Sequence, residues 1–539
     1  MTQDIGLPPW YVDFMPLIST GYLQSVFSGY ISELSNIFNN TNFLQKLSTT
    51  MSETYINTLK NFTKNSTNNP LVNIYETLNI TQETFKNLLL SEIRIKCNDD
   101  KNFVALNFLL QIFFDTFSTH NNIFLNPCYW EKILENNGAN LINGIKNFYY
   151  DAFLNSGTIS TVDKTMHSIG DDIANTPGMV VWQNDLVQLI RYKPCNKVYS
   201  IPLLIIPPFI NKYYILDIGK GKSIVSWLVQ QGYDTFLVSW CNPTPSMTNL
   251  KVEDYVVEGI KKPMDALLKL MNVSKVNVMG YCIGGTFLMM LAGALTKQKN
   301  FPINSITLLN TLLDFSFPGA SGIFIKDELV NFLQHNVALI RGDAMSGFFS
   351  WLKPNELIWH YVINNYFLGK QVKQSSIMYW NSDPPRLVGK MFAEYLQLTY
   401  LNNVLTKANG MNIYNNPVDL SEINIPIYCL AAIKDHITPF EATFQSAKML
   451  NNAVLTAVDS GHVMSVLSIP EFKKYAYYSK MPTNKDIDSS TWLKNTTCIE
   501  NNTWWDHWNS WQKQLSGEKI KSQSIKKIED APGSYVKSR

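Results

Sequence analysis

The stretch KVNVMGYCIGGTFLMMLAGAL, residues 275–295, contains a short apolar run, a cysteine flanked by glycines and a longer apolar run. The first run, Lys275 to Met279, has the length and composition of a buried strand, whereas Thr286 to Leu295 has the length of a helix. Gly280 and Gly284 stand two residues before and two after Cys282, so the chain can turn sharply there. The stretch therefore predicts a strand, a tight turn that presents Cys282, and a helix.

Five further apolar runs of strand length lie on either side of this stretch, separated by longer helical segments: Pro202 to Ile206, Thr235 to Trp240, Ser305 to Asn310, Ile425 to Ala432 and Val454 to Val458. Strands that alternate with helices predict a mostly parallel, doubly wound sheet. A nucleophile on a strand-to-helix turn in such a sheet is typical of the α/β-hydrolase fold. Reactive side chains are then expected just after the strands, at their carboxyl ends.

A nucleophile of this kind needs a base and an acid, which follow it in the order acid, then histidine. Asp435 and His462 each follow a predicted strand, so we expect them to complete a catalytic set with Cys282. His436 and Asp459 are the competing base and acid. His436 adjoins Asp435 and would point elsewhere, while Asp459, three residues before His462, more plausibly shapes the turn.

Backbone amides near Cys282 are expected to bind a developing oxyanion. The amide of Ile283 is one, and an amide of the Phe209/Ile210 turn after the first strand is the other. The N-terminus of the helix after Cys282 would also favour a thiolate, because free amides and the helix dipole stabilise negative charge.

The residue composition and the spacing of apolar residues change along the chain and divide it into three regions, one of which carries an insertion. Residues 1–165 have apolar residues at helical spacing and predict a mainly helical N-terminal region. Residues 166–470 predict the α/β-hydrolase domain, interrupted at about 312–414 by an aromatic-rich insertion that would cap the active site. Residues 471–539 predict a helical extension whose charged end, beyond Glu518, is expected to be disordered.

Composition excludes several classes of protein. Lys+Arg 45 against Asp+Glu 43 gives no attraction to nucleic acid or anionic lipid. Asn277, Thr286 and glycines interrupt the longest apolar stretch, which we therefore interpret as buried rather than membrane-spanning. The first residues lack the pattern of a signal peptide, so a cytoplasmic protein is expected.

The cysteine pattern also argues against a metal site. Seven cysteines, widely spaced and without a Cys-x-x-Cys pair, predict neither a disulfide framework nor zinc binding. Gly219 to Ser223 resembles the end of a phosphate-binding loop, but Leu216 stands where its first glycine should be. We therefore expect no metal and no cofactor.

From about Pro177 onward the sequence resembles the polyhydroxyalkanoate synthases, of the one-component type. The resemblance rests on ordered motifs along the chain, namely Pro207 to Asp217, Leu237 to Trp240 with Asn242-Pro243, the turn at Cys282, Thr307 to Leu309, Leu312 to Phe315, Trp380 to Asp383, Pro417 to Leu420, Lys434 to Ile437, Ser460 to His462, and Trp504-Trp505 with Trp508 and Trp511. One departure follows His462, where Val463-Met464-Ser465 and Ser468-Ile469-Pro470 replace the usual glycine and Asn-Pro-Pro.

The resemblance implies an acyltransferase that polymerises (R)-3-hydroxyacyl-CoA, with Cys282 as nucleophile, Asp435 as acid and His462 as base. It also implies a homodimer, found in the cytoplasm and on the granules that its polyester product forms. The crowded aromatic insertion favours the short 3-hydroxybutyryl unit. Two alternatives stay open, a thioesterase or other hydrolase of the same fold and a non-catalytic granule-coat protein. Whether Asp435 acts on His462 or on the substrate hydroxyl also stays open.

Overall fold

The structure is a computed structural model in which the chain divides into two units. It describes residues 35, 37–64, 70–96, 100–155, 157–219, 221–467, 475–480, 487–500 and 502–539. A helical unit comprises Met1–Asp163 and Ala344–Gln374, and a sheet unit comprises Lys164–Asp343 and Ser375–Arg539. The N-terminal segment compared with signal peptides and the departure at Ser468-Ile469-Pro470 lie outside the described residues.

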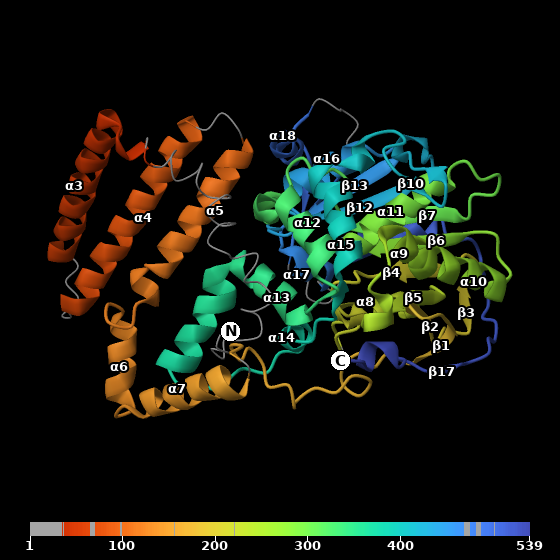
Figure 1. Cartoon of the computed structure of the whole chain (residues 1–539), viewed down its shortest axis with the longest axis horizontal. Coiled ribbons are helices and arrows are strands. Elements are labelled where there is room, and N and C mark those ends of the chain that lie inside the picture. Colours follow the sequence, from red (N-terminus) through yellow and green to blue (C-terminus); the bar gives the residue numbers. More distant parts are fainter. Residues whose placement is uncertain are drawn as a thin grey trace. The chain divides into compact units, whose positions relative to one another are not determined.

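Among the described residues of the helical unit, three long helices come first, α3 (Thr41–Lys64), α4 (Pro70–Lys96) and α5 (Asp100–Thr116). They run side by side in Figure 1. Leu106, Leu110 and Phe114 recur every fourth residue along one face of α5 and join a buried cluster with Leu89 and Ile93 of α4. The helical periodicity read from this region is thereby confirmed. The chain continues through α6 (Pro127–Glu135) and α7 (Ala139–Tyr149).

The middle of the aromatic insertion belongs to the helical unit. Its segments η7 (Asn355–Trp359) and η8 (Val362–Phe367) pack with the end of the N-terminal region. Asn140 Nδ2 donates to Phe367 O at 3.0 Å, and the Tyr366 hydroxyl donates to Asp151 Oδ2 at 2.8 Å. The insertion expected at about 312–414 is therefore divided, since only residues 312–343 and 375–414 belong to the sheet unit.

The six predicted strands form the parallel centre of one large sheet. They are β4 (Leu203–Ile206), β5 (Thr235–Trp240), β6 (Val276–Tyr281), β7 (Ile303–Leu309), β12 (Ile427–Ala432) and β13 (Ala453–Val458). Their order in the sheet is β13-β12-β7-β6-β4-β5, with parallel pairing throughout. Nearly all their side chains are buried, which explains why each strand is a continuous apolar run.

Antiparallel strands extend the sheet at both edges. On one side lie β2 (Val187–Tyr192), β1 (Gly178–Gln183) and β17 (Glu529–Asp530), and on the other β14 (Tyr477–Lys480) and β15 (Cys498–Ile499). Shorter strands pair outside this sheet, namely β3 (Lys197–Tyr199) with β16 (Lys519–Lys521), β8 (Leu339–Ile340) with β9 (Leu387–Val388), and β10 (Asn412–Ile413) with β11 (Asn416–Pro417).

Helices connect the strands, and several pack directly on them. The helix after the predicted turn is α11 (Ile283–Leu295), which contacts β4, β6 and β7, and α16 (Phe440–Lys448) packs on β12 and β13. The other helices are α8 (Ile224–Gln231), α9 (Val252–Val256), α10 (Lys262–Met271), α12 (Asp327–Asn336), α13 (Gly342–Trp351), α14 (Ser376–Asn381), α15 (Gly389–Leu396), α17 (His462–Leu467), α18 (Ser489–Lys494) and α19 (Trp504–Lys513). None of the helices in the described part of the chain is long and apolar enough to cross a membrane.

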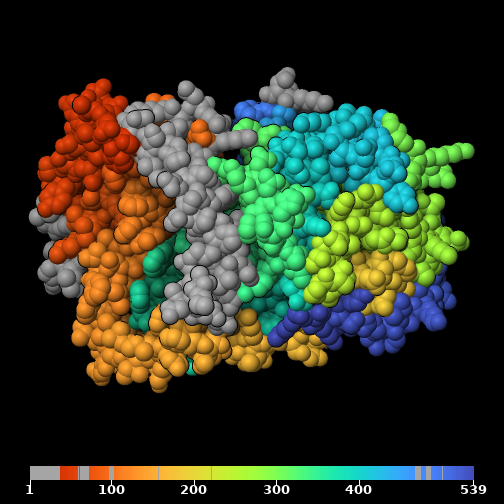
Figure 2. Space-filling model, viewed as in Figure 1, coloured from red at the N-terminus to blue at the C-terminus, as the bar shows by residue number. Residues whose placement is uncertain are grey.

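The prediction of a disordered end beyond Glu518 is wrong. Lys519–Lys521 pairs with β3, Glu529–Asp530 pairs with β1, and Arg191 Nη1 donates to Gln523 O at 2.7 Å. In Figure 2 the C-terminal residues form a dark blue band along the surface of the sheet unit. Composition misled here, because the polar side chains face solvent while the backbone is ordered by strand edges far away in the sequence.

Candidate active site

Cys282 stands on the predicted turn between β6 and α11. β6 ends at Tyr281, α11 begins at Ile283, and Cys282 itself has φ +53° and ψ −128°. A positive φ is strained for a residue with a Cβ atom, and the surrounding contacts must hold it. Its amide donates to Leu309 O of β7 at 2.8 Å, and its own carbonyl accepts from the amide of Gly285 at 2.9 Å.

The two glycines of the motif are required by close approach of backbone. A Cβ atom on Gly280 would lie 2.5 Å from Gly285 Cα, and one on Gly284 would lie 2.5 Å from Ile206 O and 2.7 Å from Pro207 O. All three distances are far inside van der Waals contact. The glycines therefore let the first turn of α11 pack against β6 and against the loop that follows β4.

The candidate acid and base meet at the carboxyl ends of β12 and β13. His462 Nδ1 lies 2.6 Å from Asp435 Oδ2, and both side chains are buried. Asp435 Oδ1 accepts from the amides of Ile437 at 2.8 Å and Thr438 at 2.9 Å. The Thr438 hydroxyl donates to Asp435 Oδ2 at 2.8 Å. Both carboxylate oxygens are thus held by hydrogen bonds, which favours an orienting role for Asp435.

The Cys282 sulfur lies near enough to His462 for its charge to act on the imidazole. Because Nδ1 faces Asp435, Nε2 is the nitrogen left to exchange a proton with the thiol. Burial lowers the pKa of His462, but the charges of Asp435 and Cys282 outweigh it and raise that pKa to about 10. Burial likewise raises the pKa of Asp435, and the opposite charge of His462 overcomes it and lowers that pKa below its usual range.

The two competing residues lie in other surroundings. Asp459 forms an ion pair with Lys434, 2.8 Å between Nζ and Oδ1, and is 46% exposed. It therefore faces solvent rather than His462. His436 is half-buried in the loop between β12 and α16, one residue beyond the carboxylate that His462 contacts.

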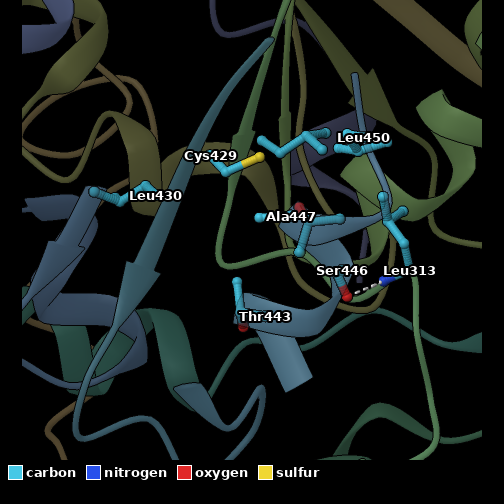
Figure 3. Close-up of a pocket in the computed structure, with 9 residues that line it drawn as sticks. Leu313, Cys429, Leu430, Thr443, Ser446, Ala447 and Leu450 are labelled. Atoms are coloured by element: carbon cyan, nitrogen blue, oxygen red, sulfur yellow. Dashed lines mark hydrogen bonds between the residues drawn. The ribbon is translucent and has the colours of Figure 1, made fainter. Parts of the chain in front are cut away.

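Two other cysteines of the sheet unit, Cys429 and Cys241, lie in surroundings that keep the thiol neutral. Cys429 on β12 lines a small cavity with Thr443, Ser446 and Ala447 of α16, and the Ser446 hydroxyl accepts from the amide of Leu313 at 2.8 Å (Figure 3). Burial raises the pKa of Cys429 to about 12, and burial raises that of Cys241 to about 12 as well. Neither thiol would ionise at neutral pH.

The predicted oxyanion amides lie on either side of the turn. Ile283 begins α11, where helix amides lack intrahelical partners. Phe209 and Ile210 lie in the loop after β4, which the missing side chain of Gly284 allows close to α11. The ring of Phe209 packs against Phe287 of α11, 4.9 Å between centroids. This places both predicted segments beside the start of α11.

Sequence reasoning missed two residues that support His462. Asn310, directly after β7 and at φ +46°, donates from Nδ2 to His462 O at 2.7 Å and to Ser465 Oγ at 2.8 Å. Tyr281 stacks on the imidazole, with ring centroids 5.5 Å apart and planes inclined by 26°. Asn310 could have been found, because it is the last residue of the predicted strand Ser305 to Asn310 and so lies at the edge of the sheet where reactive groups gather.

Two tyrosines of the insertion lie near the Cys282 sulfur. Tyr395 and Tyr400 are close enough for the charge of Cys282 to act on their hydroxyls. Phe315 packs against Tyr400 at 5.0 Å, and Phe287 packs against Tyr395 at 5.7 Å. Within the described ranges, no group of three or more His, Cys, Asp or Glu side chains is placed to hold a metal ion.

Two successive parts of the chain match known protein families. Residues 60–228 match the family described as poly-beta-hydroxybutyrate polymerase (PhaC) N-terminus, and residues 220–467 match the alpha/beta hydrolase fold. An esterase from Exiguobacterium antarcticum is a structural neighbour at 14% identity and a TM-score of 0.32, covering 53% of this chain and 93% of its own.

Curated relatives align over most of their length. The poly(3-hydroxyalkanoate) polymerase subunit PhaC of Cupriavidus necator is 34% identical over 460 residues, which are 82% of this chain and 77% of the relative. The poly(3-hydroxyalkanoate) polymerase of Methylorubrum extorquens is 33% identical over 445 residues, 80% and 73% of the two chains. With matches of this extent, and with the α/β-hydrolase sheet and its Cys282 turn in place, the chain belongs to the poly(3-hydroxyalkanoate) polymerase family, whose members are acyltransferases.

Proposed function

We propose that the chain polymerises (R)-3-hydroxyacyl-CoA thioesters, with 3-hydroxybutyryl-CoA as the preferred substrate, through an acyl group carried on Cys282. The observation that carries the proposal is the pair of His462 and Asp435, with 2.6 Å between Nδ1 and Oδ2, beside Cys282, whose charge acts on the same imidazole. A buried thiol beside a histidine oriented by a carboxylate is a nucleophile with its base.

The first half-reaction loads the enzyme. The proton of the Cys282 thiol passes to His462 Nε2, as the raised pKa of that imidazole favours, and the sulfur attacks the carbonyl carbon of the CoA thioester. A carbon–sulfur bond forms, and the negative oxygen that results is stabilised by the amide of Ile283 and an amide of the Phe209/Ile210 turn. The bond to CoA then breaks, and the departing CoA sulfur takes the proton from His462. The products are free CoA and an acyl thioester on Cys282.

The second half-reaction builds the polyester. The hydroxyl of another hydroxyacyl group gives its proton to His462 and attacks the acyl carbon on Cys282, forming an ester as the bond to the sulfur breaks. The thioester on Cys282 retains nearly the energy of the CoA thioester, so it remains activated towards an alcohol. A serine ester would not, which is why a cysteine suits acyl transfer to a hydroxyl.

The aromatic wall supports the short acyl chain. Tyr395 is buried and Tyr400 half-buried close to Cys282, and Phe315 and Phe287 pack against them. Such a wall restricts the volume beside the sulfur and excludes the water that would hydrolyse the acyl thioester. We propose that it fits the four-carbon unit better than long chains. Relative rates on 3-hydroxybutyryl-CoA and 3-hydroxydecanoyl-CoA test this, and a preference for the ten-carbon substrate would overturn it.

The proposal includes a homodimer that acts in the cytoplasm and on polyester granules. Its support is the resemblance to one-component synthases along the motifs from Pro207 to Trp511. Light scattering of the purified protein with and without 3-hydroxybutyryl-CoA measures the state of assembly. A protein that stays monomeric while it polymerises would contradict the dimer.

The decisive experiment follows two products at once. Purified protein with 3-hydroxybutyryl-CoA should release CoA and form insoluble polyester, and mass spectrometry with a non-extendable analogue should find the acyl group on Cys282. The variant Cys282→Ala should release no CoA and form no polyester. CoA release with only free hydroxybutyrate would identify a hydrolase instead, and an intact thioester would identify a non-catalytic protein.

A further inference from the structure

A buried ion pair lies beside the loop that carries the second oxyanion amide. Lys212 follows Ile210 by two residues, and its Nζ lies 3.0 Å from Oδ2 and 3.1 Å from Oδ1 of Asp383. The Tyr214 hydroxyl donates to the same carboxylate at 2.9 Å. The Lys212 side chain is only 5% exposed and that of Asp383 only 12%. A pair this buried is disrupted at a large cost when one partner is removed, unlike a pair on the surface.

Two tryptophans fix the ends of this loop through its carbonyls. Trp240 Nε1 donates to Pro207 O at 2.9 Å, and Trp380 Nε1 donates to Lys212 O at 2.8 Å. Trp380 lies in α14 and Asp383 in the turn that follows it. One short segment of the insertion thus holds Lys212 twice, by the backbone through Trp380 and by the side chain through Asp383.

The loop is also in direct contact with the helix that Cys282 precedes. Ile206 O and Pro207 O approach Gly284 so closely that a Cβ atom there would lie 2.5 and 2.7 Å from them. An amide donor stabilises an oxyanion only within a narrow range of distance, about 2.7 to 3.1 Å. A shift of the loop by a few tenths of an ångström would therefore weaken the amides of Phe209 and Ile210 without moving Cys282 or His462.

We propose that Asp383 is a positioning residue for acyl transfer: through Lys212 it holds the Phe209/Ile210 amides at the distance the oxyanion requires. The inference rests on the proposed function and adds to it a residue of the insertion that touches neither substrate nor nucleophile. It also explains why the motif Trp380 to Asp383 and the motif Pro207 to Asp217 occur together, since their side chains and carbonyls form one connected set.

Two reactions of the Cys282 sulfur distinguish a positioning role of Asp383 from a general loss of structure at the site. Acylation of Cys282 by 3-hydroxybutyryl-CoA passes through an oxyanion, whereas alkylation by iodoacetamide displaces iodide and does not. In Asp383→Asn we expect the acylation rate to fall about 10- to 100-fold, below the loss for complete removal of one oxyanion donor, about 10²- to 10³-fold. Alkylation should stay within about threefold of wild type, and the loss should appear in kcat rather than in KM.

Asp343→Asn is the matched control, because its carboxylate pairs with Arg341 at 2.8 Å but is 46% exposed. It should leave both rates within about twofold of wild type. If Asp383→Asn does not fold, Tyr214→Phe removes one hydrogen bond from the same carboxylate without changing charge. That variant should lose acylation several-fold and keep its alkylation rate.

Equal losses in the two reactions, or full acylation in a folded Asp383→Asn or Tyr214→Phe, would overturn the positioning role. The wild type separates this failure from that of the proposed function. If wild-type Cys282 is alkylated but never acylated by the thioester, both proposals fall. If the wild type is acylated and the variants match it, only the role of Asp383 falls.

Discussion

The substitution Asp435→Asn tests how the carboxylate controls His462. Asp435 Oδ2 accepts from His462 Nδ1 at 2.6 Å and from the Thr438 hydroxyl at 2.8 Å, while Oδ1 accepts from the amides of Ile437 and Thr438 at 2.8 and 2.9 Å. An asparagine amide has one acceptor oxygen instead of two. Its NH₂ group must therefore face either the imidazole or the two backbone amides.

If the NH₂ group faces the backbone amides of Ile437 and Thr438, hydrogen-bond donors face donors, which costs roughly 1–3 kcal/mol for each unsatisfied group. We therefore expect the NH₂ group to face the imidazole of His462. In this orientation the NH₂ group donates to His462 Nδ1, so the imidazole carries its proton on Nε2 and cannot accept the proton of Cys282. Loss of the required tautomer lowers kcat by about 10⁴-fold in the serine hydrolase triad. At about 1.36 kcal/mol per factor of ten, this corresponds to roughly 5.4 kcal/mol of barrier.

The assay measures steady-state CoA release from 3-hydroxybutyryl-CoA and the single-turnover rate of Cys282 acylation. Both rates should fall together by about 10⁴-fold. Asp459→Asn is the matched control, because Asp459 pairs with Lys434 and is 46% exposed, and it should change the rates little. Activity of Asp435→Asn within tenfold of wild type would refute the reasoning. Normal acylation followed by stalled elongation would instead assign Asp435 to the substrate hydroxyl.

Three further predictions concern stability and the turn. Arg191 and Asp234 form a buried pair, each side chain 1% exposed, so Arg191→Met should lower the free energy of unfolding by about 3–5 kcal/mol in urea titrations; an unchanged midpoint would contradict it. Gly284→Ala places a Cβ atom 2.5 Å from Ile206 O and should reduce acylation of a folded protein at least tenfold, whereas wild-type rates would show that the turn can relax. A neighbouring carboxylate and thiol raise the pKa of His462 from 6.5 to about 10 against the effect of burial. Protonated His462 therefore stabilises the fold fully below about pH 6.5, and this contribution is lost as pH rises through about 10. The stability difference between wild type and His462→Gln should shrink over that interval, and a constant difference would show that the raised pKa is wrong.

The parallel centre of the sheet was readable because its strands are buried on both faces. Each of the six predicted runs coincides with a strand to within one to two residues, since a buried parallel strand is a continuous apolar run with sharp ends. The meeting of Asp435 and His462 was likewise predictable, because the carboxyl ends of neighbouring parallel strands share one edge. The structure places these two side chains in contact there.

Features that depend on partners far along the chain were not readable. The insertion is aromatic throughout, so nothing in its composition separated residues 344–374, which pack in the helical unit, from the parts beside the sheet. Lys212 and Asp383 lie in separate segments and are 171 residues apart. Their pairing could not be deduced from one sequence.

One residue of β2, Arg191, is a sequence signal for its distant partner, the C-terminal segment. Arg191 interrupts the buried run of β2, VQLIRY, and a charge at a fully buried position requires an opposite charge and further hydrogen-bond acceptors. Asp234 accepts two of its hydrogen bonds, at 2.8 and 2.7 Å, and Gln523 O in the tail accepts a third at 2.7 Å. A guanidinium has five donors, so Asp234 alone would have left part of it unsatisfied. The arginine in β2 therefore required a backbone segment to cover it, and the tail beyond Glu518 is ordered because it meets that requirement.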